Sequence, residues 1–149
     1  PLLAAELTEK LTEMQDPHPD LFEALRKFLT DVQEAKDKKS ILLYLLLYQL
    51  TLLSEAGIRP VLDRCTNCPS RFSDRWKTIY FSSYNNGLLC PDCEGSFVEK
   101  KRLSAPAAAT LANLKTLKHI SENLAREIHA VLLYHFTELL GKPPKCKME

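Results

Sequence analysis

The chain has 149 residues, of which 45% are hydrophobic, and its formal net charge is +1. This length suits a single domain that buries its own apolar core. The charge is only mildly uneven, with 7 basic and 10 acidic side chains in residues 1–60 against 9 and 6 in residues 94–149. That balance excludes the strongly basic surface of a stand-alone nucleic-acid-binding protein.

Two amphipathic helices are predicted at the N-terminal end. The first has an apolar stripe at helical spacing, formed by Leu3, Leu7, Leu11 and Met14. Two prolines in segment 16–19 disfavour helical geometry and should end this helix. The second helix is expected to run from a cap at Asp20 to about Glu34. Its buried stripe is expected to be Leu21, Phe22, Leu25, Phe28, Leu29 and Val32.

The most apolar segment, Ile41–Leu53, is predicted to be the central helix of a bundle. Ser40 is its candidate N-cap, and Gly57 should end it because glycine readily adopts the left-handed conformation. The 13 residues of this segment span about 20 Å of helix, less than the roughly 30 Å of a bilayer core. We therefore expect a buried helix and no association with a membrane.

Two Cys-x-x-Cys pairs give the strongest chemical signal. Cys65 and Cys68 form the first pair, and Cys90 and Cys93 follow after 21 intervening residues. Such spacing is typical of a tetrahedral zinc site in which each pair holds one side of the ion. Four thiolates leave no open coordination position, so the predicted Zn²⁺ is structural and not catalytic. Two disulfides or a redox-active dithiol are the alternatives, and Cys146 is expected to be a free thiol.

A short hairpin is predicted between the cysteine pairs. Thr78–Ser82 has strand character, and the Asn-Asn-Gly turn at 85–87 leads into a second strand at 88–90. The aromatic side chains near this hairpin are expected to form its small core, with base stacking as the alternative; they are Trp76, Tyr80, Phe81 and Tyr84. We expect residues 61–102 to be an inserted, zinc-ribbon-like hairpin.

The chain returns to helices after the second cysteine pair. Ser104 should cap a helix that tolerates Pro106 in its first turn and buries Leu111, Leu114 and Leu117. Ser121 should cap the last helix, and Gly141 should end it. The stripe of that helix is Leu124, Ile128, Val131, Leu132, Phe136 and Leu139. The predicted fold is mainly α: one helical domain, 1–149, carrying an inserted four-cysteine zinc hairpin.

No catalytic pattern is present in the sequence. The four histidines are isolated from one another and are expected at the surface or at interfaces: His18, His119, His129 and His135. No serine lies in a Gly-x-Ser-x-Gly setting, and the few glycines form no phosphate-binding loop. Two basic clusters are candidate phosphate contacts, with solvated surface as the alternative; they are Lys100, Lys101 and Arg102, and Lys142, Lys145 and Lys147.

The chain resembles the C-terminal part of RecO, a family of bacterial DNA repair and recombination mediators. The resemblance rests on Pro19–Phe22 opening a helix, on Ala56–Pro60 leading into the first cysteine pair, on Gly87 before the second pair, and on the ending Leu140–Lys145. The segment from Gly57 to Cys68 is fairly specific, since a generic zinc ribbon lacks it. The resemblance covers nearly the whole chain.

The resemblance implies a non-enzymatic role in DNA repair, in the bacterial cytoplasm and associated with the nucleoid. Proteins of this family bind single- and double-stranded DNA, anneal strands and, with RecR, help to load RecA onto DNA coated by the single-stranded-DNA-binding protein (SSB). Their N-terminal OB-fold, which carries the main DNA surface, is expected to be absent from this chain. The alternative is a zinc-stabilised protein–protein interaction adapter that does not bind nucleic acid.

The resemblance also implies a pocket on the helical domain for the acidic, phenylalanine-ended tail of SSB. Such a tail requires an apolar hole with a cationic rim. The candidate rim residues are Arg26, Lys27, Lys38, Lys39 and Arg59.

Overall fold

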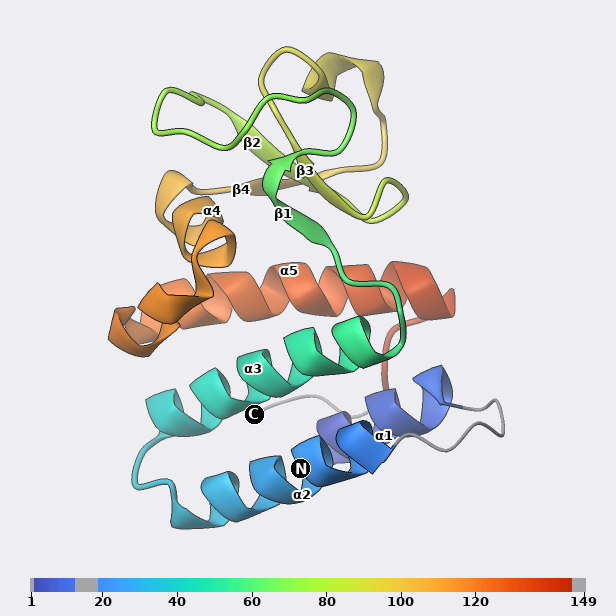
Figure 1. The fold of residues 1–149 in the computed structure, drawn as a ribbon, viewed down its shortest axis with the longest axis vertical. Helices are drawn as coiled ribbons and strands as arrows, with labels where there is room; N and C mark the ends of the chain where they lie inside the picture. The colour runs from blue at the N-terminus through green and yellow to red at the C-terminus, as the bar shows by residue number, and fades with distance from the viewer. Residues whose placement is uncertain (1, 13–18, 146–149) are drawn as a thin grey trace.

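Helices form both ends of the described chain, and a small sheet lies between them in the sequence (Figure 1). The computed structural model describes residues 2–12 and 19–145. The helices are α1 (Leu2–Leu11), α2 (Pro19–Glu34), α3 (Lys38–Glu55), α4 (Ala105–Ala112) and α5 (Glu122–Leu140), with 3₁₀ helices η1 (Glu94–Ser96) and η2 (Leu114–His119). The strands are β1 (Val61–Cys65), β2 (Ile79–Ser82), β3 (Gly87–Leu89) and β4 (Lys101–Leu103). The predicted mainly α class is confirmed.

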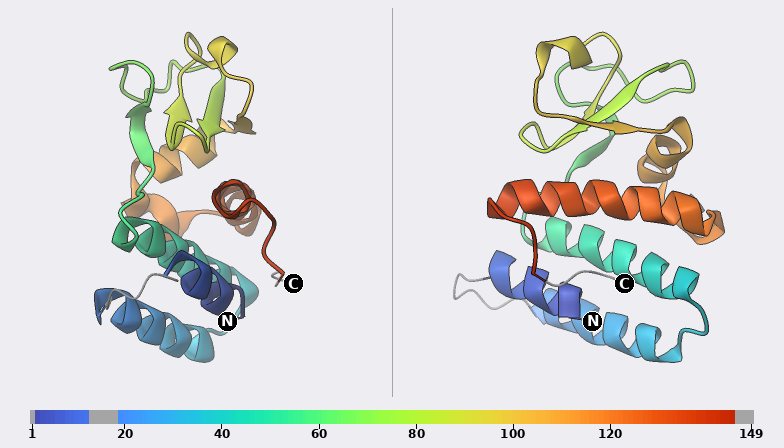
Figure 2. Two further views of the ribbon diagram at one scale, coloured as in Figure 1. Left: turned by 90° about the vertical axis from the view of Figure 1, so that its right-hand side faces the viewer. Right: turned by 180° about the vertical axis from the view of Figure 1, so that it is seen from behind.

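Helix α3 is the centre of the helical part, as its composition predicted. It contacts α1, α2 and α5, and Figure 2 shows these helices around it. Buried side chains on α3 therefore face several directions: Leu42, Leu45, Leu46, Tyr48, Gln49, Leu50, Leu52 and Leu53. None of the described helices is both long and apolar enough to cross a membrane.

The ends of α3, α4 and α5 follow local capping chemistry. Ser104 and Ser121 accept hydrogen bonds from backbone N–H groups in the first turns of α4 and α5, as predicted. Gly57, with φ of 77°, follows α3, and Gly141, with φ of 73°, caps α5. Both glycines lie in the left-handed region, where a side chain would be strained.

Two predicted N-caps are wrong by one to three residues. Asp37, not Ser40, caps α3, because its extended backbone lets Oδ1 accept the Ser40 N–H at 2.7 Å. Asp20 lies inside the first turn of α2, which begins at Pro19.

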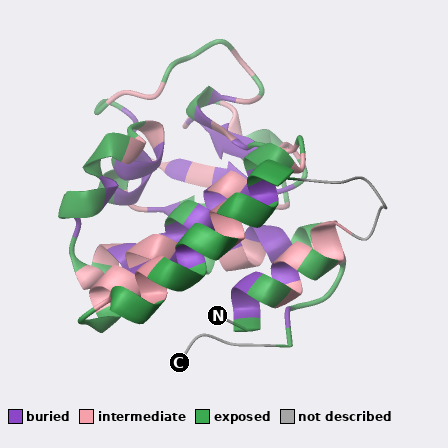
Figure 3. Cartoon of the chain, turned by 60° about the horizontal axis from the view of Figure 1, so that its bottom comes forward, coloured by how far each residue is buried: buried purple, intermediate pink, exposed green. Residues whose placement is uncertain are grey.

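Several leucine and phenylalanine positions are more exposed than predicted. Phe22 is 66% exposed and Leu29 39% exposed, because α2 packs on α3 through Leu21 and Phe28 and its other side faces solvent. Figure 3 shows such exposed positions along the helices at the bottom of the bundle. Leu139 is also 39% exposed. The predicted end of the first helix, apart from Pro19, lies outside the described residues, as do Met14, His18, Cys146 and Lys147.

The predicted hairpin is part of a four-stranded sheet with the strand order β1-β3-β2-β4. Strands β2 and β3 pair antiparallel, as predicted, but the turn between them is at 83–86 and Gly87 already belongs to β3. Two strands were not predicted from the sequence: β1, which pairs parallel to β3, and β4, which pairs antiparallel to β2. Helix α4 packs beside β1, and α5 lies between the sheet and α3 (Figure 1).

Helix α4 is shorter than its leucine pattern suggested. It ends at Ala112, because Asn113 adopts φ of −137° and its side chain accepts the N–H of Lys115. Leu114 and Leu117 therefore belong to η2, where Leu117 is buried and Leu114 half-buried. This break turns the chain sharply before α5 begins.

Candidate metal centre and adjoining groove

The fold brings the four predicted cysteines together. Cys65 ends β1, Cys68 follows in the next turn, and Cys90 and Cys93 follow β3. Their four sulfurs all lie within 4.8 Å of one another, and the sulfurs of Cys68 and Cys90 are 3.7 Å apart. A tetrahedron of thiolates at a Zn–S distance of about 2.3 Å has edges of roughly 3.8 Å. The cluster therefore has the donor set and the size to hold a metal ion.

Backbone N–H groups make the cluster favourable for thiolates. Although burial opposes ionisation of Cys65, the N–H groups of Cys90 and Asn67 donate to its sulfur, each at 3.4 Å, and its pKa is lowered to about 7. Burial, followed by the neighbouring Cys93 thiol, raises the pKa of Cys90 to about 12. Without an added positive charge, the four sulfurs do not all ionise near neutral pH. A bound cation supplies that charge.

A carboxylate fastens the sheet to helix α5. Glu99 Oε1 accepts from Ser82 Oγ at 2.9 Å and from Tyr84 N at 2.7 Å. Its Oε2 accepts from Ser83 N at 3.0 Å and from the Tyr134 hydroxyl on α5. Burial disfavours the Glu99 carboxylate, but these four donors outweigh burial and lower its pKa. The sheet that leads to the cysteine cluster is thus tied to the helices by hydrogen bonds as well as by the chain.

His135 adds a second, buried link between the sheet and α5. A hydrogen bond of 2.7 Å joins its Nδ1 to Ser83 Oγ, and the ring of Phe81 lies against it edge-on at 5.1 Å. The prediction that the isolated histidines lie at the surface or at interfaces is wrong for His135, which is fully buried within the chain. Burial lowers its pKa to about 4, with Glu99 acting in the opposite direction. The imidazole is therefore neutral at physiological pH.

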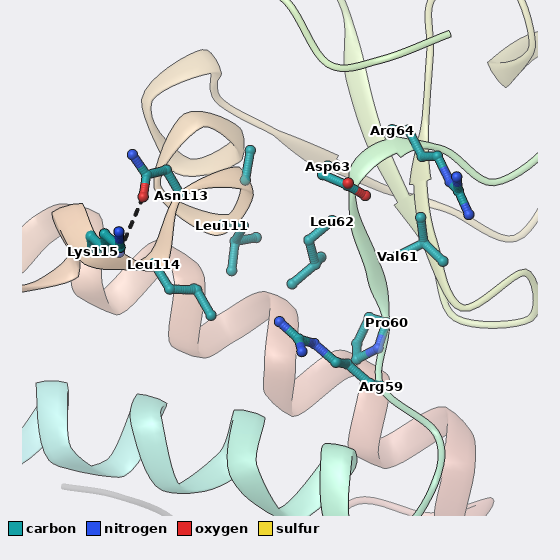
Figure 4. A pocket seen from close by; sticks show the side chains of 11 residues that line it. Arg59, Pro60, Val61, Leu62, Asp63, Arg64, Leu111, Asn113, Leu114 and Lys115 are labelled. Carbon is teal, nitrogen blue, oxygen red and sulfur yellow. Dashed lines mark hydrogen bonds between the residues drawn. The ribbon is translucent and has the colours of Figure 1, made fainter. Parts of the chain in front are cut away.

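A groove lies between β1 and the α4–η2 turn (Figure 4). It has a volume of about 680 Å³ and is lined by residues 59–64 and 111–115; we call it the β1–α4 groove. Figure 4 shows Leu62, Leu111 and Leu114 directed toward one another across it, with Arg59 reaching in beside them. Arg64 extends away on the far side of β1, and Lys115 lies beside Asn113 on the opposite wall.

The lining of the β1–α4 groove is cationic. Arg59, Arg64 and Lys115 are exposed, and within residues 2–12 and 19–145 none of the three forms a salt bridge. Asp63 is the single acidic residue in the lining. An apolar floor with this excess of cations has the chemistry to receive an anionic ligand with an apolar group.

Two smaller pockets continue from the groove along α3. One, of about 220 Å³, shares Arg59, Leu62 and Leu114 with the β1–α4 groove and adds Leu47 and Thr51. The other, of about 120 Å³, shares those last two residues and reaches the α2 surface. A hollowed surface therefore runs from β1 to α2 across the outer face of α3.

The predicted partner-binding cations do not form one cluster. Arg59 lies in the β1–α4 groove, whereas Lys38 and Lys39 lie at the opposite end of α3, an 18-residue helix and so about 27 Å long. On α2, Lys27 lines the smallest pocket and pairs with Asp31 at 3.1 Å, and Arg26 pairs with Glu23 at 3.2 Å. Of the five, Arg59 is placed best to meet an incoming anion.

The predicted DNA-contacting cations fall into two separate places. Lys100 pairs with Glu94 and lies 4.9 Å from the centre of the Tyr80 ring, so its charge is already engaged. Lys101 and Arg102 are on edge strand β4 and have no salt bridge in the described chain. Lys142 and Lys145 are exposed beyond α5, where the Lys145 N–H donates to Glu6 on α1.

Sequence reasoning missed several residues that shape these sites. Lys115 and Arg64 are ordinary basic residues in the sequence, and only the packing of α4 beside β1 brings them to one groove. Glu99 lies next to a basic run, and nothing in the sequence indicated that its carboxylate accepts four hydrogen bonds.

Comparison with known proteins gives one consistent family. The family model described as "Recombination protein O C terminal" matches residues 2–148. DNA repair protein RecO of Bacillus pumilus is 32% identical over 150 residues, covering 95% of this chain and 56% of that protein. The RecO of Bacillus subtilis is 33% identical, with 96% and 56% covered, and that of Myxococcus xanthus is 31% identical, with 78% and 44% covered.

No solved structure gives a significant match to the chain. The chain spans about half the length of the curated relatives that it matches. The family match nevertheless covers nearly every residue, including both cysteine pairs and both walls of the β1–α4 groove. The chain belongs to the RecO family of DNA repair proteins and matches the C-terminal part of those proteins.

Proposed function

We propose that this chain is the zinc-bearing part of a non-enzymatic mediator of DNA repair and homologous recombination. In this role it acts with RecR to load RecA onto single-stranded DNA coated by SSB, and it supports the annealing of complementary strands. Family membership supports the repair role. The proposed place of action is the bacterial cytoplasm, at the nucleoid.

The proposed metal is a structural Zn²⁺ held by Cys65, Cys68, Cys90 and Cys93. The support is the mutual approach of the four sulfurs, which among the described residues form a cluster of cysteine donors alone. When bound, zinc supplies a cross-link and a positive charge that favours the thiolates. The cross-link joins the end of β1 to the segment after β3, and so fixes the position of the wall that carries Arg59 and Arg64.

The proposed binding of the SSB tail rests on the chemistry of the β1–α4 groove. Its leucine floor suits one apolar side chain, and its cations suit acidic residues beside that side chain. An acidic peptide ending in phenylalanine, as expected for the SSB tail, has both features, and its terminal carboxylate adds another negative charge. We place the phenylalanine ring over Leu62, Leu111 and Leu114, with Arg59 at the carboxylate.

Fluorescence anisotropy with a labelled acidic peptide ending in phenylalanine tests this placement. Arg59→Glu should weaken binding at least about tenfold, because it replaces an attraction with a repulsion at the floor of the groove. Lys38→Glu makes the same change of charge at the far end of α3 and should have little effect. A peptide with its terminal phenylalanine replaced by alanine should also bind poorly. Equal losses for the two protein variants would show only a general charge effect and contradict the site.

A further inference from the structure

The most exposed large apolar side chains lie at one end of the metal-bearing sheet. Tyr84 is 89% exposed and Val98 is 99% exposed. The other aromatic residues near this hairpin have a structural role, since Trp76 and Phe81 are buried in the core. Only Tyr84 presents a nearly complete aromatic face to solvent, in the turn between β2 and β3.

The register of the sheet places these two side chains together. Strands β2 and β4 are antiparallel, with Phe81 opposite Lys101 and Tyr80 opposite Arg102. Beyond the strand ends, Glu99, the residue after Val98, accepts the N–H groups of Ser83 and Tyr84, which brings the two segments side by side. We call this pair, Tyr84 and Val98, the apolar tip.

Glu99 holds the apolar tip in place. Its carboxylate accepts the N–H groups of Ser83 and Tyr84 and is itself fixed by the Tyr134 hydroxyl of α5. The two loops that carry the tip are therefore fastened to each other and to the helical part. A preorganised aromatic surface loses less conformational entropy on binding than a mobile one. The four donors around Glu99 also offset its negative charge close to the tip.

Unpaired cations lie next to the apolar tip on strand β4. The ammonium of Lys101 is 5.8 Å from the centre of the Tyr134 ring, and Tyr134 bonds to the same carboxylate as the Tyr84 N–H. Arg102 is exposed and follows Lys101 on this edge strand. Lys101 follows Val98 by three residues, a separation of at most about 10 Å, which three stacked nucleotides can span.

We infer that the apolar tip is a base-stacking contact for single-stranded DNA. Tyr84 stacks on one base, Val98 packs against its edge or its sugar, and Lys101 and Arg102 meet the adjacent phosphates. Glu99 is a positioning residue that does not touch the nucleic acid. This inference rests on the proposed role in DNA repair and deepens it by naming a contact surface. The cations beside the tip favour nucleic acid over an apolar protein partner.

Binding of a fluorescein-labelled oligothymidylate to the zinc-loaded chain at low ionic strength tests the inference. Tyr84→Ala should weaken binding by about 5- to 100-fold, the range of single base–aromatic stacks, while Tyr84→Phe keeps the ring and should bind nearly as the parent chain does. Phe22→Ala removes another exposed aromatic ring, on α2, and should leave the affinity unchanged. Zinc content and melting temperature show that each variant is folded.

The salt dependence of binding provides a second readout. Lys101→Ala and Arg102→Ala should each reduce the slope of log K against log salt by about 1, whereas Lys100→Ala, which removes a cation already paired with Glu94, should change it less. An unchanged affinity of Tyr84→Ala would overturn the inference and assign the tip to protein contact. Undetectable DNA binding by the parent chain would overturn the inference as well. The proposed mediator role is tested separately, by peptide binding in the β1–α4 groove.

Discussion

Glu99, Lys100 and Lys101 are adjacent in the sequence but occupy three different surroundings. Glu99 accepts four hydrogen bonds and ties the sheet to α5. Lys100 is paired with Glu94, and Lys101 has no carboxylate partner in the described part of the chain. Lys100 therefore has a structural role, whereas the charge of Lys101 is available to a ligand.

The buried imidazole of His135 predicts a loss of stability in mild acid. Burial lowers its folded pKa to about 4, below the value of about 6.5 expected when unfolded. The unfolded state therefore binds more protons between these values. The contribution of the neutral ring is complete above pH 6.5 and is lost as the pH falls toward 4. Between pH 7 and pH 5 the free energy of unfolding should fall by about 2 kcal/mol on this account.

Urea unfolding at several pH values measures this effect. His135→Gln is expected to be less stable at pH 7 and to show a flatter dependence on pH down to 5, because the titrating group is gone. His119→Gln changes an exposed histidine on η2 and should keep the parent slope. Loss of thiolates in acid affects all three proteins alike. If the slopes of the parent chain and His135→Gln coincide, His135 is not the group responsible.

At the scale of secondary-structure elements, the parallel pairing of β1 with β3 depends on a close approach at Gly87. A Cβ atom at this position would lie 2.3 Å from the carbonyl oxygen of Val61 and 2.5 Å from the methyl group of Thr66. Both contacts are far below van der Waals distance, and one of them is to backbone that cannot rotate away. The strand that leads into the second cysteine pair is thus set directly against the strand that carries the first.

Gly87→Ala is expected to destabilise the protein by about 1–3 kcal/mol, the usual range for overpacking, and to weaken metal retention by separating β1 from β3. Gly95→Ala is the matched control, since nothing lies within 4 Å of a Cβ there and its φ is not positive. That variant should remain within about 0.5 kcal/mol of the parent. Thermal unfolding and a chelator titration measure the two effects, and equal behaviour of both variants would contradict the close approach.

Helices were more predictable from the sequence than strands because their signals are local. The caps Ser104 and Ser121 and the left-handed Gly141 depend on contacts within a few residues, and all three are confirmed. Strands β1 and β4 have only 5 and 3 residues, and their partners β3 and β2 lie about 20 residues or more away. Pairing at such a distance leaves little trace in a short segment.

The candidate sites likewise differ in how far local sequence signals predicted them. The cysteine cluster was predictable because metal geometry fixes the spacing within each pair, and the structure brings all four sulfurs together. The β1–α4 groove was not, since Arg59 and Lys115 are far apart in the sequence and meet only through the packing of α4 beside β1. Arg59 was proposed as a rim residue, but no sequence pattern distinguished it from Lys38 or Lys39.

At the scale of the whole molecule, the sheet and the helices share one hydrophobic core. A single cluster of buried residues extends from Leu7 on α1 through Leu53 and Phe136 to Phe81 and Trp76 in the metal-bearing part. Glu99 and His135 reinforce the contact between β2 and α5 with hydrogen bonds. A metal-bearing segment that ends in the same core as the helices cannot unfold without exposing their apolar surface to water.

We therefore expect the two parts to unfold together. The chain has one tryptophan, Trp76, which is 8% exposed in the metal-bearing part, so its fluorescence reports that part, while circular dichroism at 222 nm reports the helices. Urea curves from the two signals should coincide, as in a two-state transition. Cys90→Ser, which removes a proposed metal ligand, should shift both curves to lower urea, and Cys146→Ser should shift neither. If the tryptophan signal changes first while the helical signal persists, the metal-bearing sheet is a separate folding unit and zinc does not stabilise the helical core.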